Sequence, residues 1–342
     1  MAWISMRAGV CKILATPSGA TAVSKPFLQI NLKGVFPLQA ACISGSVLRD
    51  KNKVRPAPFP YKTKRKLDPE LPAAARSFDE KSFCIEPNHE FAASFQILKY
   101  QLRYSKYIDA LAHLLNTGQG VVLERCVYSD FVFLETMHKA GYISKGAHSV
   151  YYDIYNNTID ELMKPHLVIY LDIPVPLVQQ RIKDRNIPHE VNSKVFTSQY
   201  LSDMEYFYKQ RYLKEIGTHS ELLIYDWSSY GDVEVVIEDI ERINFDKFNK
   251  YDTKMDDWKL PCEWDWNTAR MLYTNDKDIL MYSFLIPRFD VPELVLDAYD
   301  AHKFRKIWHN APGMKYDKEF NPDMGDTNLL FKTKKIDHRS SS

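Results

Sequence analysis

The fold class follows from HLVIYLDIPVPLVQQRIKDRN, residues 166–186. Five apolar residues in succession, Leu167 to Leu171, are closed by Asp172. Such a run predicts a strand buried on both faces, because a half-buried strand would alternate apolar and polar residues. In the stretch that follows, apolar residues such as Val175, Val178 and Ile182 are three and four positions apart, as on one face of a helix. A buried strand leading into a helix is the unit from which parallel sheets are built, so an α/β fold is indicated.

The same pattern recurs along the chain. Apolar runs also occur at Val121–Glu124 and Leu222–Asp226, and a long amphipathic helix is expected from Glu90 to Leu115, ended by Gly118. We therefore predict a parallel sheet of three recognisable strands, flanked by helices on both faces. Shorter helices are expected near Asp130–Lys139, Val150–Met163, Val175–Arg185, Ser198–Ile216 and Asp232–Phe245.

Charge is distributed unevenly over the 342 residues. Residues 1–67 contain 12 basic residues and one acidic residue, whereas the remainder contains 33 basic and 43 acidic residues. The acid-free beginning is rich in Ala, Ser and Thr, which is typical of a mitochondrial transit peptide; a disordered basic tail is the alternative. The predicted parts are a transit peptide or disordered tail at 1–50, a basic, proline-containing arm at 51–81, the α/β domain at 82–245 and an extension at 246–342.

The extension has a different composition from the α/β domain. Four of the six tryptophans and several prolines fall in residues 246–342, which predicts an irregular and helical segment rather than a layered core of its own. Exposed aromatic side chains are common anchors of protein interfaces. We expect the extension to pack on the α/β body and to present an outward face to partners; the alternative is that it only folds back on the body.

Several classes of function are disfavoured by the sequence. No stretch approaches the roughly 18 uninterrupted apolar residues that a membrane helix needs, so a chain peripheral to the membrane, not spanning it, is expected. The acidic body argues against a nucleic-acid partner. Cysteines and histidines are scattered, so no metal site is expected, and no flavin motif or redox centre is found.

The ends of the strands offer candidate site residues. In a parallel sheet, ligands bind beyond the carboxyl ends of the strands, and the first run ends in Glu124-Arg125, followed by Asp130. A carboxylate there can position a sugar hydroxyl while the guanidinium neutralises a phosphate. The alternative is an internal ion pair that braces the turn. Arg181 and Arg185, one helical turn apart, can clamp a phosphoryl group, but this spacing is also common on solvated helices.

Two segments carry a resemblance to a known family. GQGVVLERCVYSDFVF, residues 118–133, resembles the E-R-S segment of deoxyribonucleoside kinases, and residues 166–186 resemble their fourth strand and arginine-bearing lid. Gln96 and Arg103 fall where that family places its base-reading residues. The resemblance, over about residues 82–245, implies a P-loop kinase-like fold. It further implies that Glu124, Arg125 and Asp130 support the 5′-hydroxyl and phosphates, that Gln96 and Arg103 bind the base, and that Arg181 and Arg185 hold the transferring phosphoryl group.

A specialised branch of this family is more similar still. YSFLIPRFDVPELV, APGMKY and NPDMGD in the extension are similar to the kinase-like accessory subunits of mitochondrial respiratory complex I, and ordinary deoxynucleoside kinases lack that tail. The resemblance implies a non-catalytic accessory subunit with a role in assembly or stability. Its partners would be other complex I subunits, and its location the matrix side of the inner membrane. An active mitochondrial deoxynucleoside kinase is the alternative.

The sequence departs from the family in two ways. Near Lys64-Arg65 a whole βαβ unit, including the glycine-rich phosphate loop, is expected to be missing, and Cys126 replaces the serine of E-R-S. No G-x-x-x-x-G-K-[ST] occurs, so no nucleotide or other cofactor is expected and the seven site residues are interpreted as vestigial. In the kinase fold the missing strand lies between those ending at Glu124 and Asp172. We expect these two strands to pair directly; insertion of Phe27–Val35 is the less favoured alternative.

Overall fold

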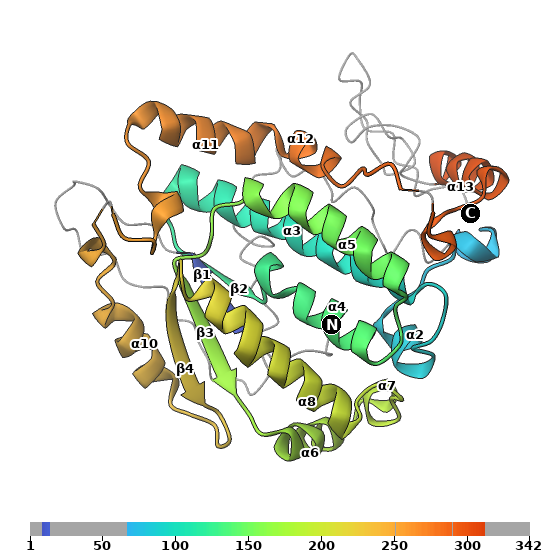
Figure 1. The fold of residues 1–342 in the computed structure, drawn as a ribbon, viewed down its shortest axis with the longest axis horizontal. Coiled ribbons are helices and arrows are strands. Elements are labelled where there is room, and N and C mark those ends of the chain that lie inside the picture. The colour runs from blue at the N-terminus through green and yellow to red at the C-terminus, as the bar shows by residue number, and fades with distance from the viewer. Residues whose placement is uncertain (1–8, 14–66, 250, 289, 312–342) are drawn as a thin grey trace, which may run out of the picture. The chain divides into compact units, whose positions relative to one another are not determined.

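The structure, a computed structural model, describes residues 9–13, 67–249, 251–288 and 290–311. It forms two compact units: residues 1–55 with 79–293, and residues 56–78 with 294–342. The first unit contains the sheet and the helices around it (Figure 1). Residues 51–66 of the predicted basic arm, Phe27–Val35 and the tail motif at 321–326 lie outside the described residues. The bounds of domains predicted from the sequence remain predictions.

Four strands and the helices between them follow in chain order (Figure 1). The strands are β1 (Gly9–Ile13), β2 (Val121–Glu124), β3 (Leu167–Asp172) and β4 (Glu221–Asp226). The helices are α2 (Glu80–Ile85), α3 (Ala92–Thr117), α4 (Phe131–Lys139), α5 (Lys145–Thr158), α6 (Val175–Arg185), α7 (Pro188–Val191), α8 (Ser198–Phe207), α9 (Leu213–Ile216), α10 (Val233–Arg242), α11 (Glu263–Asn275), α12 (Lys277–Tyr282) and α13 (Ala298–Asn310). Short 3-10 turns occur at Ala73–Ala75, Val127–Ser129, Ile159–Glu161, Phe245–Lys247, Asp256–Trp258 and Pro292–Leu294, and a π-helical turn at Tyr208–Tyr212.

Most of the predicted elements are confirmed. The long helix α3 ends where the sequence indicated, because Gly118 adopts a left-handed conformation (φ 68°) and its N–H closes the last turn on the Leu114 carbonyl at 2.8 Å. The helix predicted at Val150–Met163 begins too late. Ser144 accepts a hydrogen bond from the Ala147 N–H and so starts α5 at Lys145.

Three strands run in one direction, as predicted, but the sheet has a fourth. The strand order is β2-β1-β3-β4: β3 and β4 are parallel, whereas β1 is antiparallel to both of its neighbours. Cys11 is opposite Leu123 on one side and Val168 on the other. The prediction that the strands ending at Glu124 and Asp172 pair directly is therefore wrong, because β1 lies between them.

An N-terminal segment does insert, although it is not the one named from the sequence. Direct closure would have moved β2, and the helices packed on it, toward β3. A strand placed between β2 and β3 forms hydrogen bonds with the backbone N–H and C=O groups of both strands, and each hydrogen bond contributes about 1 kcal/mol. The strand that inserts contains a charged residue, Lys12. These residues also fall within the predicted transit peptide, so its removal would remove a central strand.

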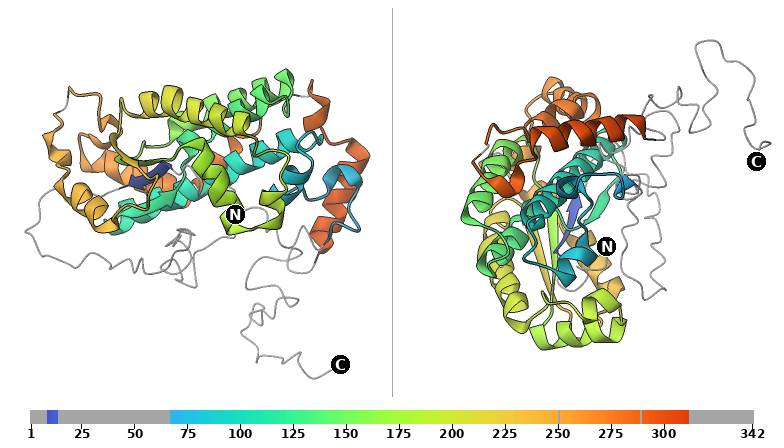
Figure 2. Two further views of the ribbon diagram at one scale, coloured as in Figure 1. Left: turned by 90° about the horizontal axis from the view of Figure 1, so that it is seen from below. Right: turned by 90° about the vertical axis from the view of Figure 1, so that its right-hand side faces the viewer.

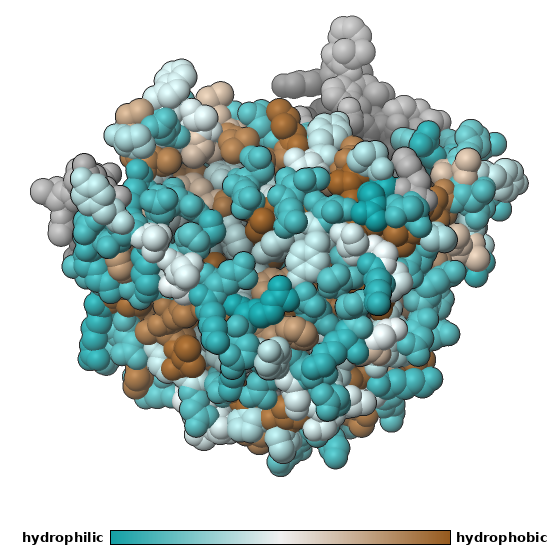
Figure 3. All heavy atoms as spheres, in the orientation of Figure 1, coloured by the Kyte–Doolittle hydropathy of each residue, from teal (hydrophilic) through white to brown (hydrophobic). Residues whose placement is uncertain are grey.

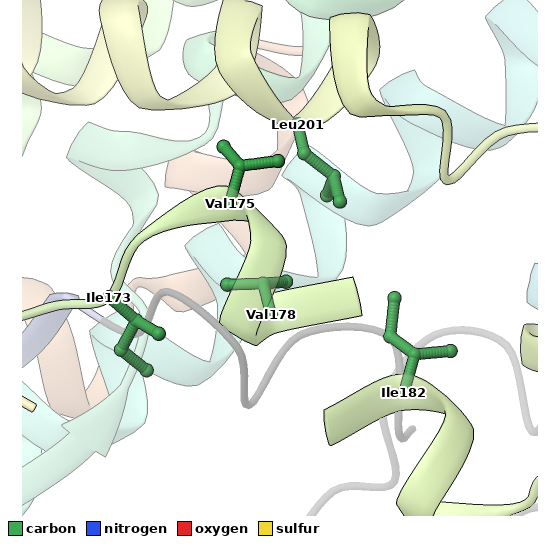
Figure 4. Packing of buried hydrophobic residues seen from close by; sticks show 5 residues of the cluster. All are labelled: Ile173, Val175, Val178, Ile182 and Leu201. Atoms are coloured by element: carbon green, nitrogen blue, oxygen red, sulfur yellow. The ribbon is translucent and has the colours of Figure 1, made fainter. Parts of the chain in front are cut away.

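Helices lie on both faces of the sheet (Figure 2). The segment after β3 is fixed by a cluster of buried side chains, Ile173, Val175, Val178 and Ile182, which packs against Leu201 of α8 (Figure 4). The position of α3 is fixed by tyrosines that are completely buried. Tyr104 donates to the Thr158 carbonyl at 3.1 Å and Tyr107 to the Met163 carbonyl at 2.8 Å, so this helix is tied to the end of α5 and the turn that follows.

Helices α11 and α12 of the C-terminal extension pack along α3 (Figure 1). Tyr273 of α11 is buried and donates to the Glu161 carbonyl at 2.9 Å, while Lys277 of α12 donates to Asp109 on α3 at 2.6 Å. This part of the extension therefore packs on the body, as the sequence predicted. Within the described residues, no helix is long and apolar enough to cross a membrane.

The second unit has a small core of its own. Leu67 and Leu71 pack with Trp308 and Ala311 of the α13 region, and the ring of Phe304 stacks on Trp308 at a centroid distance of 5.9 Å. Asp68 accepts a hydrogen bond from the Ser77 N–H at 2.8 Å, and this bond closes the segment between the two residues.

Strand β1 gives a direct test of the sheet. Lys12→Pro removes a backbone N–H and places a ring in a central strand, where proline is not accommodated. We expect a loss of about 1–3 kcal/mol in the free energy of unfolding, measured by urea denaturation of the full chain. Lys33→Pro, outside the strand, is the matched control. Equal stability of the two variants would contradict the insertion of β1.

His166 gives a second test, through pH. Burial lowers the pKa of His166 to about 3. Its ring lies against the ring of Trp258, with centroids 3.9 Å apart and the planes tilted by 31°. His166 takes up a proton near pH 6.5 in the unfolded chain, but only near pH 3 in the folded protein. The contribution of His166 to the free energy of unfolding is therefore complete above pH 6.5 and falls by about 1.4 kcal/mol per pH unit toward pH 3. His166→Phe should flatten the decline of unfolding free energy between pH 6.5 and 5. An unchanged decline would refute this assignment; His302→Phe, at an exposed position, is the control.

Candidate functional site

The candidate site centres on Asp130, which is completely buried between β2 and α4. Gln96 of α3 donates to one carboxylate oxygen at 2.8 Å, and Tyr151 of α5 donates to the same oxygen at 2.7 Å. Arg103, two turns after Gln96 on α3, forms an ion pair with the other oxygen. The structure thus brings three of the predicted site residues, Gln96, Arg103 and Asp130, into direct contact, together with Tyr151.

Arg125 joins this group through an aromatic ring. The guanidinium carbons of Arg103 and Arg125 lie 4.8 and 4.7 Å from the ring centre of Phe133. A cation over an aromatic face is attracted by the ring quadrupole, and more strongly where both are desolvated. The Phe133 ring therefore attracts both guanidinium groups and offsets part of the cost of burying them.

The Glu124-Arg125 turn has a strained backbone. Arg125 adopts a left-handed conformation (φ 62°), which costs a residue with a Cβ roughly 1 kcal/mol or more. This conformation turns the chain from the end of β2 into the 3-10 turn Val127–Ser129. Cys126, in the serine position of E-R-S, is buried, and its sulfur lies 3.5 Å from the Tyr212 hydroxyl.

Burial controls the protonation of these groups. It lowers the pKa values of Arg103 and Arg125, and the charge of Arg103 lowers the pKa of Arg125 further. It raises the pKa of Glu124, although the charge of Arg125 opposes the shift. It raises the pKa of Tyr208 as well, against the influence of both arginines. The cluster therefore carries more buried positive than buried negative charge.

Arg181 and Arg185 have other partners. Arg181 donates to the carbonyls of Trp227 at 2.8 Å and Ser228 at 3.0 Å, and Arg185 forms an ion pair with Glu190 at 3.4 Å. These contacts tie α6 to the loop after β4 and to α7. Their suggested role in holding a phosphoryl group is not tested by this arrangement.

Two residues of the cluster were not identified from the sequence. Phe133 lies three residues after Asp130, on the same side of the chain, so its helical spacing was a usable signal. Tyr151 carried no local signal, because it reaches Asp130 only through the packing of α5. No group of His, Cys, Asp and Glu side chains suited to a metal ion occurs among the described residues.

A sheet with a Glu-Arg turn at a strand end, facing Gln and Arg side chains from one long helix, defines a nucleoside-kinase type of α/β domain. Comparison with known families agrees: the deoxynucleoside kinase family model matches residues 82–260. The chain belongs to the deoxynucleoside kinase family.

Individual relatives fall into two groups. The mouse protein "NADH dehydrogenase [ubiquinone] 1 alpha subcomplex subunit 10, mitochondrial" is 40% identical over 248 residues, 72% of this chain and 66% of the relative, and the bovine protein of that name is 40% identical over 227 residues. The deoxyguanosine kinase of Dictyostelium discoideum is 31% identical over 163 residues, 48% of this chain and 56% of the relative. The chain matches 60–66% of the length of the complex I relatives from mouse, cow and rat.

The buried carboxylate can be tested by removing its charge. Asp130→Asn keeps an acceptor for Gln96 and Tyr151 but leaves Arg103 without its counter-charge. We expect a loss of about 3–5 kcal/mol in unfolding free energy, because an uncompensated buried cation remains. Asp290→Asn, at an exposed ion pair with Arg288, should cost less than about 1 kcal/mol.

A double variant separates this effect from a packing defect. Asp130→Asn combined with Arg103→Gln should lose less stability than the sum of the two single variants, since neither charge is then left alone. Strict additivity of the two losses would rule out the ion pair as the cause.

Proposed function

We propose that the protein is a non-catalytic accessory subunit of mitochondrial respiratory complex I, with a role in assembly or stability. The observation that carries the proposal is the similarity to the complex I relatives, 40% over 72% of this chain, against 31% over 48% for a deoxyguanosine kinase. On this proposal the protein acts at the matrix side of the inner membrane, peripheral to it. Its partners are other subunits of that complex.

The state of the candidate site supports a non-catalytic role. Gln96 and Arg103, the residues expected to bind a base, are both engaged with Asp130 inside the protein. A nucleoside would have to replace these bonds with equally good ones, in a site where unpaired polar groups are costly. The cluster stabilises the junction of α3, α4 and α5 as it stands.

The chemistry of phosphoryl transfer supports the same conclusion. The reaction depends on positioning and neutralising the phosphates, and a phosphate loop supplies most of both. The 342 residues contain no G-x-x-x-x-G-K-[ST] sequence. Arg181 and Arg185, the remaining candidates for phosphate contacts, are engaged with carbonyl groups and with Glu190.

The kinase alternative rests on the family itself and on the retained Glu124-Arg125 turn, and one assay separates the two functions. We expect the purified full chain to consume no ATP in response to deoxyadenosine, deoxyguanosine, deoxycytidine or thymidine with Mg²⁺, measured as ADP release. Arg125→Ala is the control for contaminating kinases. A turnover that persists through purification and disappears in Arg125→Ala would establish the kinase instead.

A further inference from the structure

A row of large apolar side chains faces outward on the extension. Trp264 and Met271 on α11, Ile279 and Tyr282 on α12, and Leu285 just beyond it are between 49% and 76% exposed. We call these five residues the α11–α12 stripe. Apolar (brown) side chains are visible over these helices in Figure 3. Single exposed apolar residues are ordinary, whereas several on one segment are typical of a surface that another molecule covers.

The stripe is held rigidly on the body. The opposite side of the same segment contains buried Tyr273 and Leu280, and Asn116 of α3 donates to the Thr274 hydroxyl at 2.8 Å. Lys277 adds hydrogen bonds to Asp109 and to the Ser105 carbonyl. A surface that is already ordered loses little conformational entropy when it docks, which favours affinity.

The stripe lies outside the part of the chain that matches kinases. The deoxynucleoside kinase model ends at residue 260, four residues before Trp264. The match to the mouse complex I relative covers 248 residues, more than the span 82–260, whereas the match to the deoxyguanosine kinase covers 163. The surface therefore belongs to a segment that nucleoside phosphorylation in this family does not require.

The charge around the stripe restricts what can cover it. Residues 261–293 contain six acidic and three basic residues. Each basic residue is paired within the protein: Arg270 with Glu263, Lys277 with Asp109 at 2.6 Å, and Arg288 with Asp153 at 2.5 Å. The Glu263 side chain is nevertheless 80% exposed. A complementary partner presents apolar side chains bordered by Lys or Arg.

We infer that the α11–α12 stripe is the docking surface for a neighbouring protein subunit, one that presents an apolar helix face with basic residues at its edges. The inference rests on the proposed function, since it assigns to one surface the contact that an accessory subunit needs. A membrane surface fits less well, because helices that bind anionic lipids carry Lys and Arg rather than excess acid. A second copy of the chain would place acidic residues opposite acidic residues in a two-fold contact.

The test compares two triple variants of the full chain. Trp264→Ser with Tyr282→Ser and Leu285→Ser removes three stripe residues that are 67–76% exposed. Ile85→Ser with Tyr206→Ser and Val235→Ser removes three apolar groups of the kinase-like part that are 50–55% exposed. Each is imported into isolated mitochondria, and the fraction that migrates with complex I on native gels is measured. We expect the stripe variant to assemble at least tenfold less than wild type and the control within twofold. Equal thermal unfolding midpoints of the purified variants exclude a folding defect.

The outcomes separate the inference from the proposed function. If wild type does not join complex I, both fail; if wild type and the stripe variant assemble equally, only the docking surface fails. Glu263→Lys should reduce assembly severalfold, and an unchanged or higher level would overturn the basic edge of the partner.

Two further measurements exclude the other occupants. In the first measurement, wild type and the stripe variant are floated with phosphatidylcholine–cardiolipin vesicles. The inference is overturned if wild type floats with the vesicles, the stripe variant does not, and the stripe variant still assembles normally with complex I. It is equally overturned if sedimentation reveals a wild-type dimer that only the stripe variant disrupts, again with normal assembly.

Discussion

The arrangement of the sheet depends on the backbone hydrogen bonds that β1 makes with β2 on one side and with β3 on the other. In the described sheet β2 stands at an edge and β3 inside, and the facing sides of both strands carry a row of N–H and C=O groups that must be paired. The chain meets this requirement with Gly9–Ile13, which runs antiparallel to its neighbours although β2, β3 and β4 share one direction. The position of β2, and hence of the Glu124-Arg125 turn at its end, follows from that pairing.

The Glu124-Arg125 turn also determines the geometry of the polar cluster around Asp130. Arg125 leaves the strand in a left-handed conformation, so that its guanidinium and that of Arg103 lie on the ring of Phe133, while Asp130 is enclosed by α3 and α5. Isolated, each of these charges would be very costly to bury. Gln96, Tyr151 and Arg103 all bond to Asp130, and the cluster keeps an excess of buried positive charge. Residue types suited to binding a nucleoside thereby connect α3, α4 and α5 at one strand end.

The sequence predicted the local elements better than their pairing. The bounds of α6 and β3, the end of α3 at Gly118 and the packing of α11 on the body follow from periodicity, capping and composition, which act over a few residues. The central strand was missed because its pairing joins Cys11 to residues more than a hundred positions away, and no local pattern distinguishes it. For the same reason Tyr151 was not foreseen, whereas the helical spacing of Phe133 from Asp130 made it accessible.

The Asp130 cluster and the α11–α12 stripe of the first unit differ in which side chains they bury. Around Asp130, buried polar and charged groups bond to one another, and Gln96 and Arg103 are both engaged with the carboxylate. On α11 and α12, large apolar groups are exposed although Tyr273 and Leu280 on the same helices show that the body can bury such side chains. Covering a rigid, exposed apolar surface lowers the free energy, so the proposed docking would stabilise the protein as part of an assembly.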